Sequence, residues 1–457
     1  MASSIAESTT SQDHREAVVN QIVGKLTLFH WGGTSYVSMP TRAGNRAVRA
    51  RGNQFKRYVT RQVHSVGLSS DTRLIQQIIE IADAQAFLGG KEVEPFRRIA
   101  LIDGCTYIDS GRRGEVISVT PDRWETISDT GVPFLSLPGI RQLPEPLRAQ
   151  RGSAKELEAT GLGFEEAHLV LFWLIGVVAG LFVPILRIVG EHAERLNGFI
   201  RAIVDPNALL VRAAPRDVRD LRLYASNSAI VALHLRRLSA HLSDGILDIA
   251  VRMGYAKCQL YSDYEEAYYP SQSPLILSHE ADLDVPRELE EASLTVSWDC
   301  GGRSHRDMEM LRQLHHPTLL GHVVQGASFA LRSEEQDLAT AVAQANRYFR
   351  WPDNLVRNLL DEAQFEAIHT ALKPYSFVPY LAELTPWSGT ATTLLGRLND
   401  KANDEDRIAD RWPDSAQTLG TTLRRLEPKL LATGLRVEHG RGPAPKRERT
   451  ISLRAVG

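Results

Sequence analysis

Residues 185–207 occupy the position at which an α/β protein builds a phosphate-binding loop. The apolar run Ile185–Val189 predicts a buried strand, Gly190 follows it directly, and residues 198–204 predict a helix. A loop of the G-x-x-x-x-G-K-[ST] type needs glycines for close backbone approach, a lysine for the β- and γ-phosphates, and a hydroxyl for magnesium. Nucleotide chemistry is therefore the first function to test against the residues at this position.

The groups that this chemistry requires are missing from the loop. The segment reads GEHAERLN, in which Gly190 is the only glycine and which contains no lysine, serine or threonine. Glu191 and Glu194 are expected to repel a triphosphate. We therefore predict no catalytic residue, no metal ligand and no bound cofactor, and the residues that remain at the nucleotide position are Gly190, Glu191, His192 and Arg195.

A second group of candidate residues gathers at the C-terminus, where the charge is strongly positive. Between Leu423 and the end of the chain there are nine arginines and lysines and only three glutamates. The whole chain has a formal net charge of −2, so attraction to nucleic acid must come from a local patch of this kind. Basic side chains that neutralise phosphates make DNA binding depend on salt.

The elements around these charges are predicted to follow the order of a winged helix. A short helix at 390–398 precedes a longer helix that Ser415 caps and Gly434 ends. Strands at 435–438 and 450–453 follow, joined by the loop HGRGPAPKRER. The alternative is a small packing or protein-contact domain with a solvated basic tail. The predicted DNA-binding residues are Gln417, Thr418, Thr421, Arg424, Arg425, Lys429, Arg441, Lys446, Arg447 and Arg449.

The length of 457 residues, at roughly 150 residues per domain, predicts about three domains. Further core strands are predicted at 229–233, 275–277 and 294–296, and His315-His316-Pro317 is interpreted as a loop. We expect a mixed α+β N-terminal domain at 1–150, an α/β core at 151–332, a helical connector at 333–385 and the winged helix at 386–457.

The N-terminal third combines β-structure with a basic stretch. A hairpin is predicted at 26–39, a helix at 72–88 and a β-meander at 98–128. Seven arginines and lysines lie between positions 42 and 61 with no acidic residue among them. Phe55 and Tyr58 in this stretch could stack on nucleic-acid bases, although aromatic residues here also suit the packing of a helix onto a core.

One apolar run raises the question of a membrane. Residues 169–186 carry no charge, and eighteen such residues approach the length of a membrane-spanning helix. Gly176 weakens a helix and Pro184 breaks its last turn. We therefore favour a buried helix to about Leu181 followed by a strand at Ile185–Val189, and we keep a membrane-associated scaffold as an alternative.

The cysteines and the N-terminus predict a cytoplasmic location. Cys105, Cys258 and Cys300 are far apart and form no C-x-x-C pair, which fits a reducing compartment and argues against a zinc ribbon. The first eleven residues lack the apolar core of a secretory signal.

The chain resembles a family of phage and mobile-element ATP-binding proteins that is related to the helicase portion of phage primase–helicases. The resemblance implies a P-loop, AAA+-like core with a Walker A sequence after the first core strand and an acidic Walker B after the second. It lies in RIALIDGCTYIDSG and VTPDRWETISDTGVPF, in IVDPNALLVRAAPRDVRDLRLYASNSAIVAL and HLSDGILDIAVRMGYAKCQLYSDYEEAYY, and in GTATTLLGRLN and WPDSAQTLGTTLRRLEPKL.

This chain departs from that family pattern at both Walker positions. Its Walker A segment is the shortened GEHAERLN, and the second core strand ends in Leu233-His234-Leu235, with no aspartate for magnesium. The polar sensor expected after the third strand falls on Ser278. We therefore expect a degenerate P-loop core, because the lysine, the hydroxyl and the acid are lost together.

The predicted function is that of a DNA-binding, replication-type helicase- or ATPase-like protein of a phage or mobile element that does not hydrolyse ATP. Its expected partner is DNA, bound through the C-terminal domain, with self-association through the core and no membrane contact. The alternative is an active ATP-dependent helicase with an unusual phosphate site, in which Arg195 or Arg187 supplies the cation and ATP and magnesium are cofactors.

Overall fold

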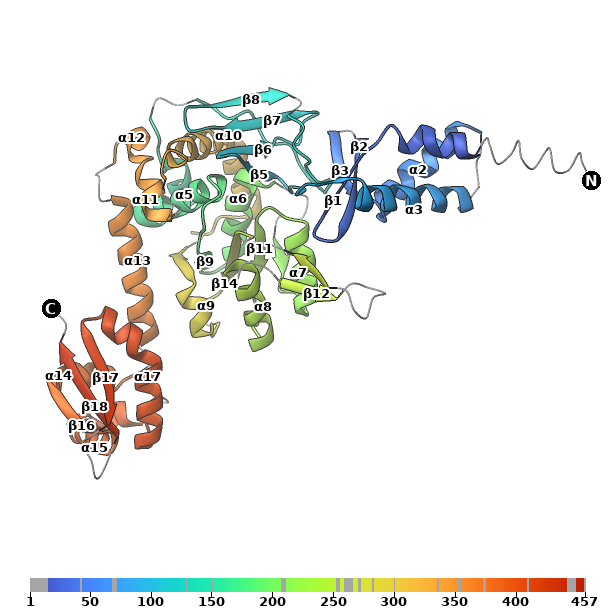
Figure 1. Ribbon diagram of the computed structural model, residues 1–457. Coiled ribbons are helices and arrows are strands. Elements are labelled where there is room, and N and C mark those ends of the chain that lie inside the picture. Colours follow the sequence, from blue (N-terminus) through green and yellow to red (C-terminus); the bar gives the residue numbers. More distant parts are fainter. Residues whose placement is uncertain are drawn as a thin grey trace, which may run out of the picture. The chain divides into compact units, whose positions relative to one another are not determined.

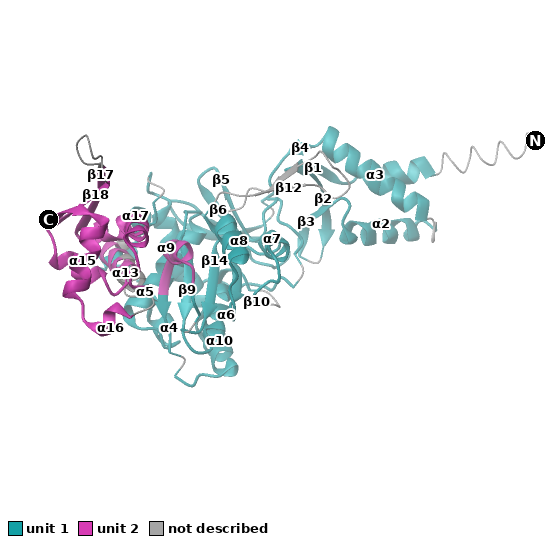
Figure 2. Ribbon diagram, turned by 90° about the horizontal axis from the view of Figure 1, so that it is seen from below, with its two compact units in different colours: residues 1–284, 296–356 teal, residues 285–295, 357–457 magenta. Residues whose placement is uncertain are grey.

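Figure 1 shows the computed structural model of the chain with its helices and strands labelled. The chain forms two compact units (Figure 2): unit 1 comprises residues 1–284 and 296–356, and unit 2 comprises residues 285–295 and 357–457. The structure describes residues 15–41, 43–67, 72–128, 130–137, 139–148, 151–206, 211–251, 255–258, 266–269, 273–281, 283–299, 301–334, 337–351, 355–372, 375–408, 411–441 and 449–455.

The N-terminal part of unit 1 is a four-stranded sheet covered by two helices. The predicted hairpin is confirmed, with β1 (Thr27–Trp31) antiparallel to β2 (Thr34–Thr41). The sheet order is β3-β2-β1-β4, with β3 at Gly44–Arg49 and β4 at Lys91–Glu92. Helices α2 (Asn53–Ser65) and α3 (Thr72–Leu88) share one core with the sheet, which includes Val37, Val48, Phe55, Val59, Leu74 and Ile78.

The basic stretch at 42–61 runs through β3 and α2, and part of it is buried. The Arg46 guanidinium forms a buried ion pair with Asp109 at 2.7 Å. The Phe55 ring lies fully inside the core between sheet and helices. The idea that Phe55 stacks on bases is therefore wrong, because the helical spacing turns the ring toward the sheet.

The predicted β-meander is also confirmed. Its four strands pair antiparallel with their sequence neighbours. The turn between the first two strands uses Asp103 and Gly104, both with positive φ (50° and 72°), as two-residue hairpin turns require. The strands are β5 (Ile99–Ile102), β6 (Cys105–Asp109), β7 (Glu115–Val119) and β8 (Trp124–Ser128).

Unit 1 holds the parallel strands of a five-stranded sheet with the order β10-β11-β14-β9-β15. The pairs β10–β11, β11–β14 and β14–β9 are parallel, so the carboxyl ends of these four strands meet at one edge. The four predicted core strands are confirmed, and β10 is an addition to them. The strands are β9 (Ile185–Val189), β10 (Arg212–Ala213), β11 (Val231–His234), β14 (Leu275–His279) and β15 (Ser293–Ser297).

Helices and one small hairpin accompany this sheet in unit 1. Figure 1 shows α6 beside β9 and β11, and α6 also packs against α10. The helices are α4 (Lys155–Glu158), α5 (Phe164–Val178), α6 (Ala193–Val204), α7 (Val218–Ser226), α8 (Ala240–Ala250), α10 (His305–Ala330), α11 (Leu338–Ala343) and α12 (Asn346–Phe349), and the hairpin pairs β12 (Tyr255–Cys258) with β13 (Glu266–Tyr269).

The uncharged run 169–186 is divided between a helix and a strand, as predicted. Helix α5 ends at Val178 and is buried from Ala167 onward, where it packs against α10 and α11. The Trp173 indole donates a hydrogen bond to the Pro184 carbonyl at 2.7 Å, which fixes the turn before β9. Among the residues that the structure describes, no helix combines the length and apolarity needed to cross a membrane.

The interpretation of His315-His316-Pro317 as a loop is wrong, because these residues lie inside α10. A capping box between Ser304 and Asp307 begins this helix. The buried His316 ring lies 2.9 Å from the Ile203 carbonyl through Nε2, and the Leu147 amide donates to the Pro317 carbonyl. These contacts with neighbouring segments hold a helix through a sequence that by itself signals a turn.

A buried charge network joins the β-meander to the parallel sheet. The Asp205 carboxylate, 2 % exposed, contacts the Arg98 guanidinium at 3.4 Å and the Arg201 guanidinium at 3.2 Å. Its Oδ2 also accepts the backbone amides of Ala229 and Ile230 just before β11. Arg98, which precedes β5, donates in addition to the backbone carbonyls of Asp109, Arg141 and Pro206.

Unit 2 combines helices with a three-stranded antiparallel sheet of order β16-β18-β17. Its core includes Leu394, Leu398, Leu419, Leu423, Val437 and Leu453. The helices are α9 (Arg287–Glu291), α13 (Leu355–Leu372), α14 (Val378–Glu383), α15 (Ala391–Lys401), α16 (Asp404–Arg407) and α17 (Ala416–Ala432), and the strands are β16 (Trp387–Thr390), β17 (Leu435–Arg441) and β18 (Arg449–Ala455).

The Asp205 network predicts a large loss of stability when its acid is removed. We expect Asp205→Ala to lower the free energy of unfolding by about 3–5 kcal/mol, because the buried Arg98 and Arg201 charges lose the carboxylate that contacts both of them. Asp217→Ala, which removes an exposed carboxylate that caps α7, is the matched control and should cost about 1 kcal/mol. Urea unfolding measures both, and equal losses would contradict the assigned role of Asp205.

The buried ring of His316 predicts a pH-dependent stability. Burial first, and then the charges of Arg312 and Arg98, lower its pKa from 6.5 to about 4. The folded state favours the neutral ring, so its contribution is present above pH 6.5 and is lost as the pH falls toward 4, by up to about 3 kcal/mol. Urea unfolding of His316→Gln should show a smaller loss over this interval than the unchanged chain, and parallel curves would refute this.

Candidate functional site

The predicted nucleotide position lies between β9 and α6, at the carboxyl edge of the parallel sheet. Three residues, Gly190, Glu191 and His192, connect the strand to the helix. The Gly190 amide donates to the His279 carbonyl at 3.1 Å, and a Cβ at Gly190 would lie 1.9 Å from the backbone oxygen of Trp298. Close packing against Trp298 therefore explains this glycine without any ligand.

The other predicted residues at this position take part in local contacts. Glu191 is 77 % exposed, and its carboxylate lies 3.5 Å from the His192 ring, whose backbone is left-handed with φ 56°. The Arg195 guanidinium is only 16 % exposed and donates a hydrogen bond to the Arg303 carbonyl. The four predicted residues are thus adjacent, but the arginine is turned toward the backbone that precedes α10.

Beside this loop, polar side chains at the ends of β11 and β14 bond to one another. The buried Asn197 amide donates to the Leu233 carbonyl and to the Ser278 hydroxyl, both at 3.0 Å. The His234 ring approaches the same hydroxyl at 3.3 Å. The Ser278 hydroxyl, predicted at the sensor position, in turn donates to the Leu233 carbonyl. These bonds tie α6 to the sheet.

Asn197 was missed by the sequence analysis. It is the last residue of GEHAERLN, which the sequence predicts to be a loop, whereas the structure places it on the sheet-facing side of α6. An asparagine in an otherwise apolar helical stripe was the signal available, because a buried amide needs partners.

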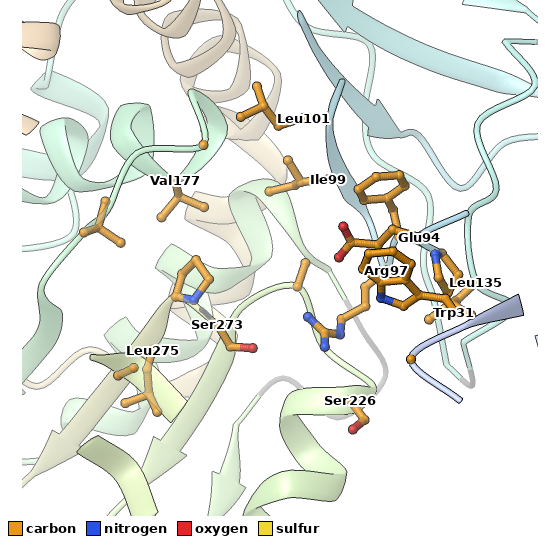
Figure 3. A pocket seen from close by; sticks show the side chains of 18 of the residues that line it. Trp31, Glu94, Arg97, Ile99, Leu101, Leu135, Val177, Ser226, Ser273 and Leu275 are labelled. Atoms are coloured by element: carbon orange, nitrogen blue, oxygen red, sulfur yellow. The ribbon is translucent and has the colours of Figure 1, made fainter. Parts of the chain in front are cut away.

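A cavity of about 270 Å³ lies at the opposite, amino edge of β9 and β14. Figure 3 shows Trp31, Glu94 and Arg97 on one side of it and Ser273 and Leu275 on the other. The Ser273 hydroxyl is buried and has no hydrogen-bond partner among the described residues. None of the predicted site residues lines this cavity.

In unit 2, helix α17 presents a polar face opposite its leucines. Ser415 caps the helix as predicted, through its hydroxyl and the Thr418 amide. Gln417, Thr421 and Arg424, spaced four and three residues apart, share one exposed stripe. The opposite stripe, made of Leu419, Leu423, Leu426 and Leu430, is buried in the unit core.

Two basic residues of α17 are occupied within unit 2. The Lys429 ammonium is 4 % exposed and lies 3.6 Å from the Glu291 carboxylate of α9. The expectation that Lys429 contacts DNA is therefore wrong, because the helix turns this residue toward the buried side. Arg425 is exposed, and its guanidinium donates to the Tyr375 hydroxyl at 2.7 Å.

The hairpin of β17 and β18 brings further arginines opposite one another. Arg441 pairs in register with Arg449 at the end of the hairpin where the two strands are connected, and Arg436 pairs with Arg454 near its open end. The Arg449 side chain is exposed. The predicted residues Lys446 and Arg447 lie outside the described residues.

The site and fold define a mixed α/β protein with a parallel core sheet and a separate C-terminal unit, whose excess of positive charge is confined to the segment after Leu423. Residues 375–457 match the family described as the AICE RepA C-terminal domain, a replication-associated domain of mobile elements. No curated protein matches the chain. This match coincides with the segment for which the sequence predicted DNA binding.

Two solved structures are similar to the chain along most of its length. One is titled "SCCmec type IV Cch - active helicase"; it has 10 % sequence identity and a TM-score of 0.45, over 94 % of this chain and 93 % of that one. The other is titled as the apo C-terminal region of NrS-1; it has 10 % identity and a TM-score of 0.40, over 96 % of this chain and 99 % of that one.

The packing of Gly190 predicts the effect of its substitution. We expect Gly190→Ala to lower the free energy of unfolding by about 1–3 kcal/mol or more, because the added methyl meets the Trp298 carbonyl. Glu191→Ala, at the exposed neighbouring position, should change it by less than about 0.5 kcal/mol. The comparison is made by urea unfolding, and an unchanged stability of Gly190→Ala would show that this glycine is not required by packing.

Proposed function

We propose that this chain is a replication-associated, DNA-binding protein of a mobile element and that unit 2 holds its DNA-binding surface. The observation that carries the proposal is the exposed polar stripe of α17, which lies opposite a leucine core within a segment that matches a RepA-type domain. A helix supported in this way can enter a major groove.

The arrangement around α17 supports the interpretation of unit 2 as a winged helix. Helices α15 and α17 pack against each other, and α17 leads directly into the hairpin of β17 and β18. In a winged helix, a hairpin in this position contacts the DNA backbone beside the recognition helix. We assign phosphate contacts to Arg424 and Arg449, and contacts to phosphates or base edges to Gln417 and Thr421.

We also propose that the chain does not hydrolyse ATP. Three observations support this. The three-residue connection after β9 carries no lysine or hydroxyl, and the backbone of Trp298 occupies the space beside Gly190. Strand β11 ends at His234, at the position where phosphoryl transfer needs an acid for magnesium. The alternative of an active enzyme predicts ATP turnover with magnesium and DNA that Arg195→Ala abolishes. Association of copies through the core stays a prediction.

The DNA-binding proposal predicts a change in salt dependence. Arg424→Ala with Arg449→Ala should weaken binding to a labelled duplex and reduce the slope of log affinity against log salt by about 2, one unit for each phosphate that the variant no longer neutralises. Fluorescence anisotropy of the full chain over a series of salt concentrations gives both values.

Lys429→Met is the matched control, because it removes a positive charge from the same helix at a buried position. It should leave the slope unchanged. The assigned surface is wrong if the double variant keeps the affinity and slope of the unchanged chain, or if Lys429→Met lowers the slope as much as the double variant does.

A further inference from the structure

A cavity of about 840 Å³ in unit 1 is lined by an unusual number of arginines. It lies beside the carboxyl ends of β10 and β11, between the first turns of α6, α8 and α10. Gly190 and Glu191 do not line it, whereas Arg195 of the predicted nucleotide position does, so the cavity adjoins the connection after β9 without including it. Its arginines are Arg195, Arg212, Arg216, Arg236, Arg237 and Arg312.

Three of these arginines already have partners. The Arg312 guanidinium forms a bidentate pair with the Glu309 carboxylate, at 2.5 and 2.8 Å. Arg212 lies over the Tyr224 ring at 4.4 Å, and Arg195 donates to a backbone carbonyl. These three charges shape the wall of the cavity.

The other three arginines are available for a ligand. Arg216, Arg236 and Arg237 are exposed, and within the described part of the chain no hydrogen bond or ion pair engages their side chains. Among the described residues that line the cavity, two carry a carboxylate, Glu194 and Glu309. Glu309 is neutralised by Arg312, and Glu194 lies within 4.0 Å of both Arg195 and His234. The cavity therefore carries a net positive charge.

The backbone holds two of the free arginines in place. After β11 the Leu235 amide donates to the Ser278 carbonyl at 2.8 Å, so the chain stays against β14 until it reaches Arg236 and Arg237. Ser239 then caps α8 through the Leu242 amide. The N-terminus of this eleven-residue helix adds a partial positive charge beside the two arginines.

The inner wall of the cavity is apolar. Phe199 of α6, Leu242 of α8 and Met308 of α10 line it and are themselves almost fully buried. An apolar wall beside a cationic rim suits a ligand with a flat ring at one end and phosphates at the other. The volume is of the size that small-molecule sites have, a few hundred to about a thousand Å³.

We propose that this cavity binds a phosphate ester of the nucleotide class through Arg216, Arg236 and Arg237, and that it does so without a divalent metal ion. Where a phosphoryl-transfer site would hold magnesium with acids after the second core strand, this chain places two arginines, which neutralise the phosphates directly. The ligand is a free nucleotide or the terminal nucleotides of a single strand, which present the same groups.

The test measures binding to the full-length chain in the presence of EDTA. One arm uses a fluorescent ATP analogue, and the other uses a labelled oligothymidine strand. Arg236→Ala with Arg237→Ala should weaken binding of one or both probes by about tenfold or more. Arg216→Ala, which lies on a different element, should act in the same direction, so a folding defect in one variant does not decide the outcome.

Arg57→Ala with Arg61→Ala is the matched control, since it removes two exposed arginines of α2 that do not line the cavity. It should leave binding of the ATP analogue within about twofold. A loss confined to the ATP analogue identifies a free nucleotide, and a loss confined to the oligonucleotide identifies a strand terminus. Binding of neither probe in EDTA, binding that requires magnesium, or cavity variants that bind like the unchanged chain would overturn the proposal.

The outcome is separable from that of the proposed function. The arginines tested here lie in unit 1, whereas duplex binding is assigned to α17 and its hairpin in unit 2. If the chain binds no ATP analogue but binds duplex DNA through Arg424 and Arg449, only the cavity proposal fails. If it binds the ATP analogue through the cavity arginines but binds no duplex DNA, only the DNA-binding proposal fails.

Discussion

The Asp205 carboxylate is the charge on which the organisation of unit 1 depends. It contacts Arg98 from the β-meander and Arg201 from its own helix, and it accepts two amides at the start of β11. A buried carboxylate is stable only when cations neutralise its charge and donors bond to its lone pairs. The segments that supply these groups are therefore held in fixed positions relative to one another. This arrangement therefore helps to fix the carboxyl edge of the parallel sheet, where the candidate sites lie.

At that edge, two neighbouring positions have opposite character. The connection after β9 is short, is packed against Trp298, and exposes Glu191. The cavity beside β11 has a volume of about 840 Å³ and carries a net positive charge. If a phosphate binds to unit 1, electrostatics favours the second position over the first, and the affinity would come from guanidinium groups, whose charge persists at any physiological pH.

The sequence predicted most elements whose signal is local. Alternating apolar residues located the meander, continuous apolar runs located the core strands, and Ser415 and Gly434 located the ends of α17. Helix α10 is not among the predicted elements, because His316 and Pro317 signal a turn until the Ile203 carbonyl and the Leu147 amide are brought next to them. Lys429 was misassigned for a similar reason, since its partner Glu291 is far away in the sequence. The arginine cavity is formed by four separate segments of the chain, so no residue spacing within one segment predicts it.

Unit 2 is assembled from two stretches of chain that are not consecutive. The short helix α9 belongs to it, and there Glu291 compensates Lys429 while Arg287 donates to the Arg425 carbonyl. A fragment that begins near residue 375, where the family match begins, would lack both groups. In such a fragment the Lys429 ammonium would be exposed and would lack its partner carboxylate. Its charge would then be free to attract nucleic acid, which it is not in the intact chain.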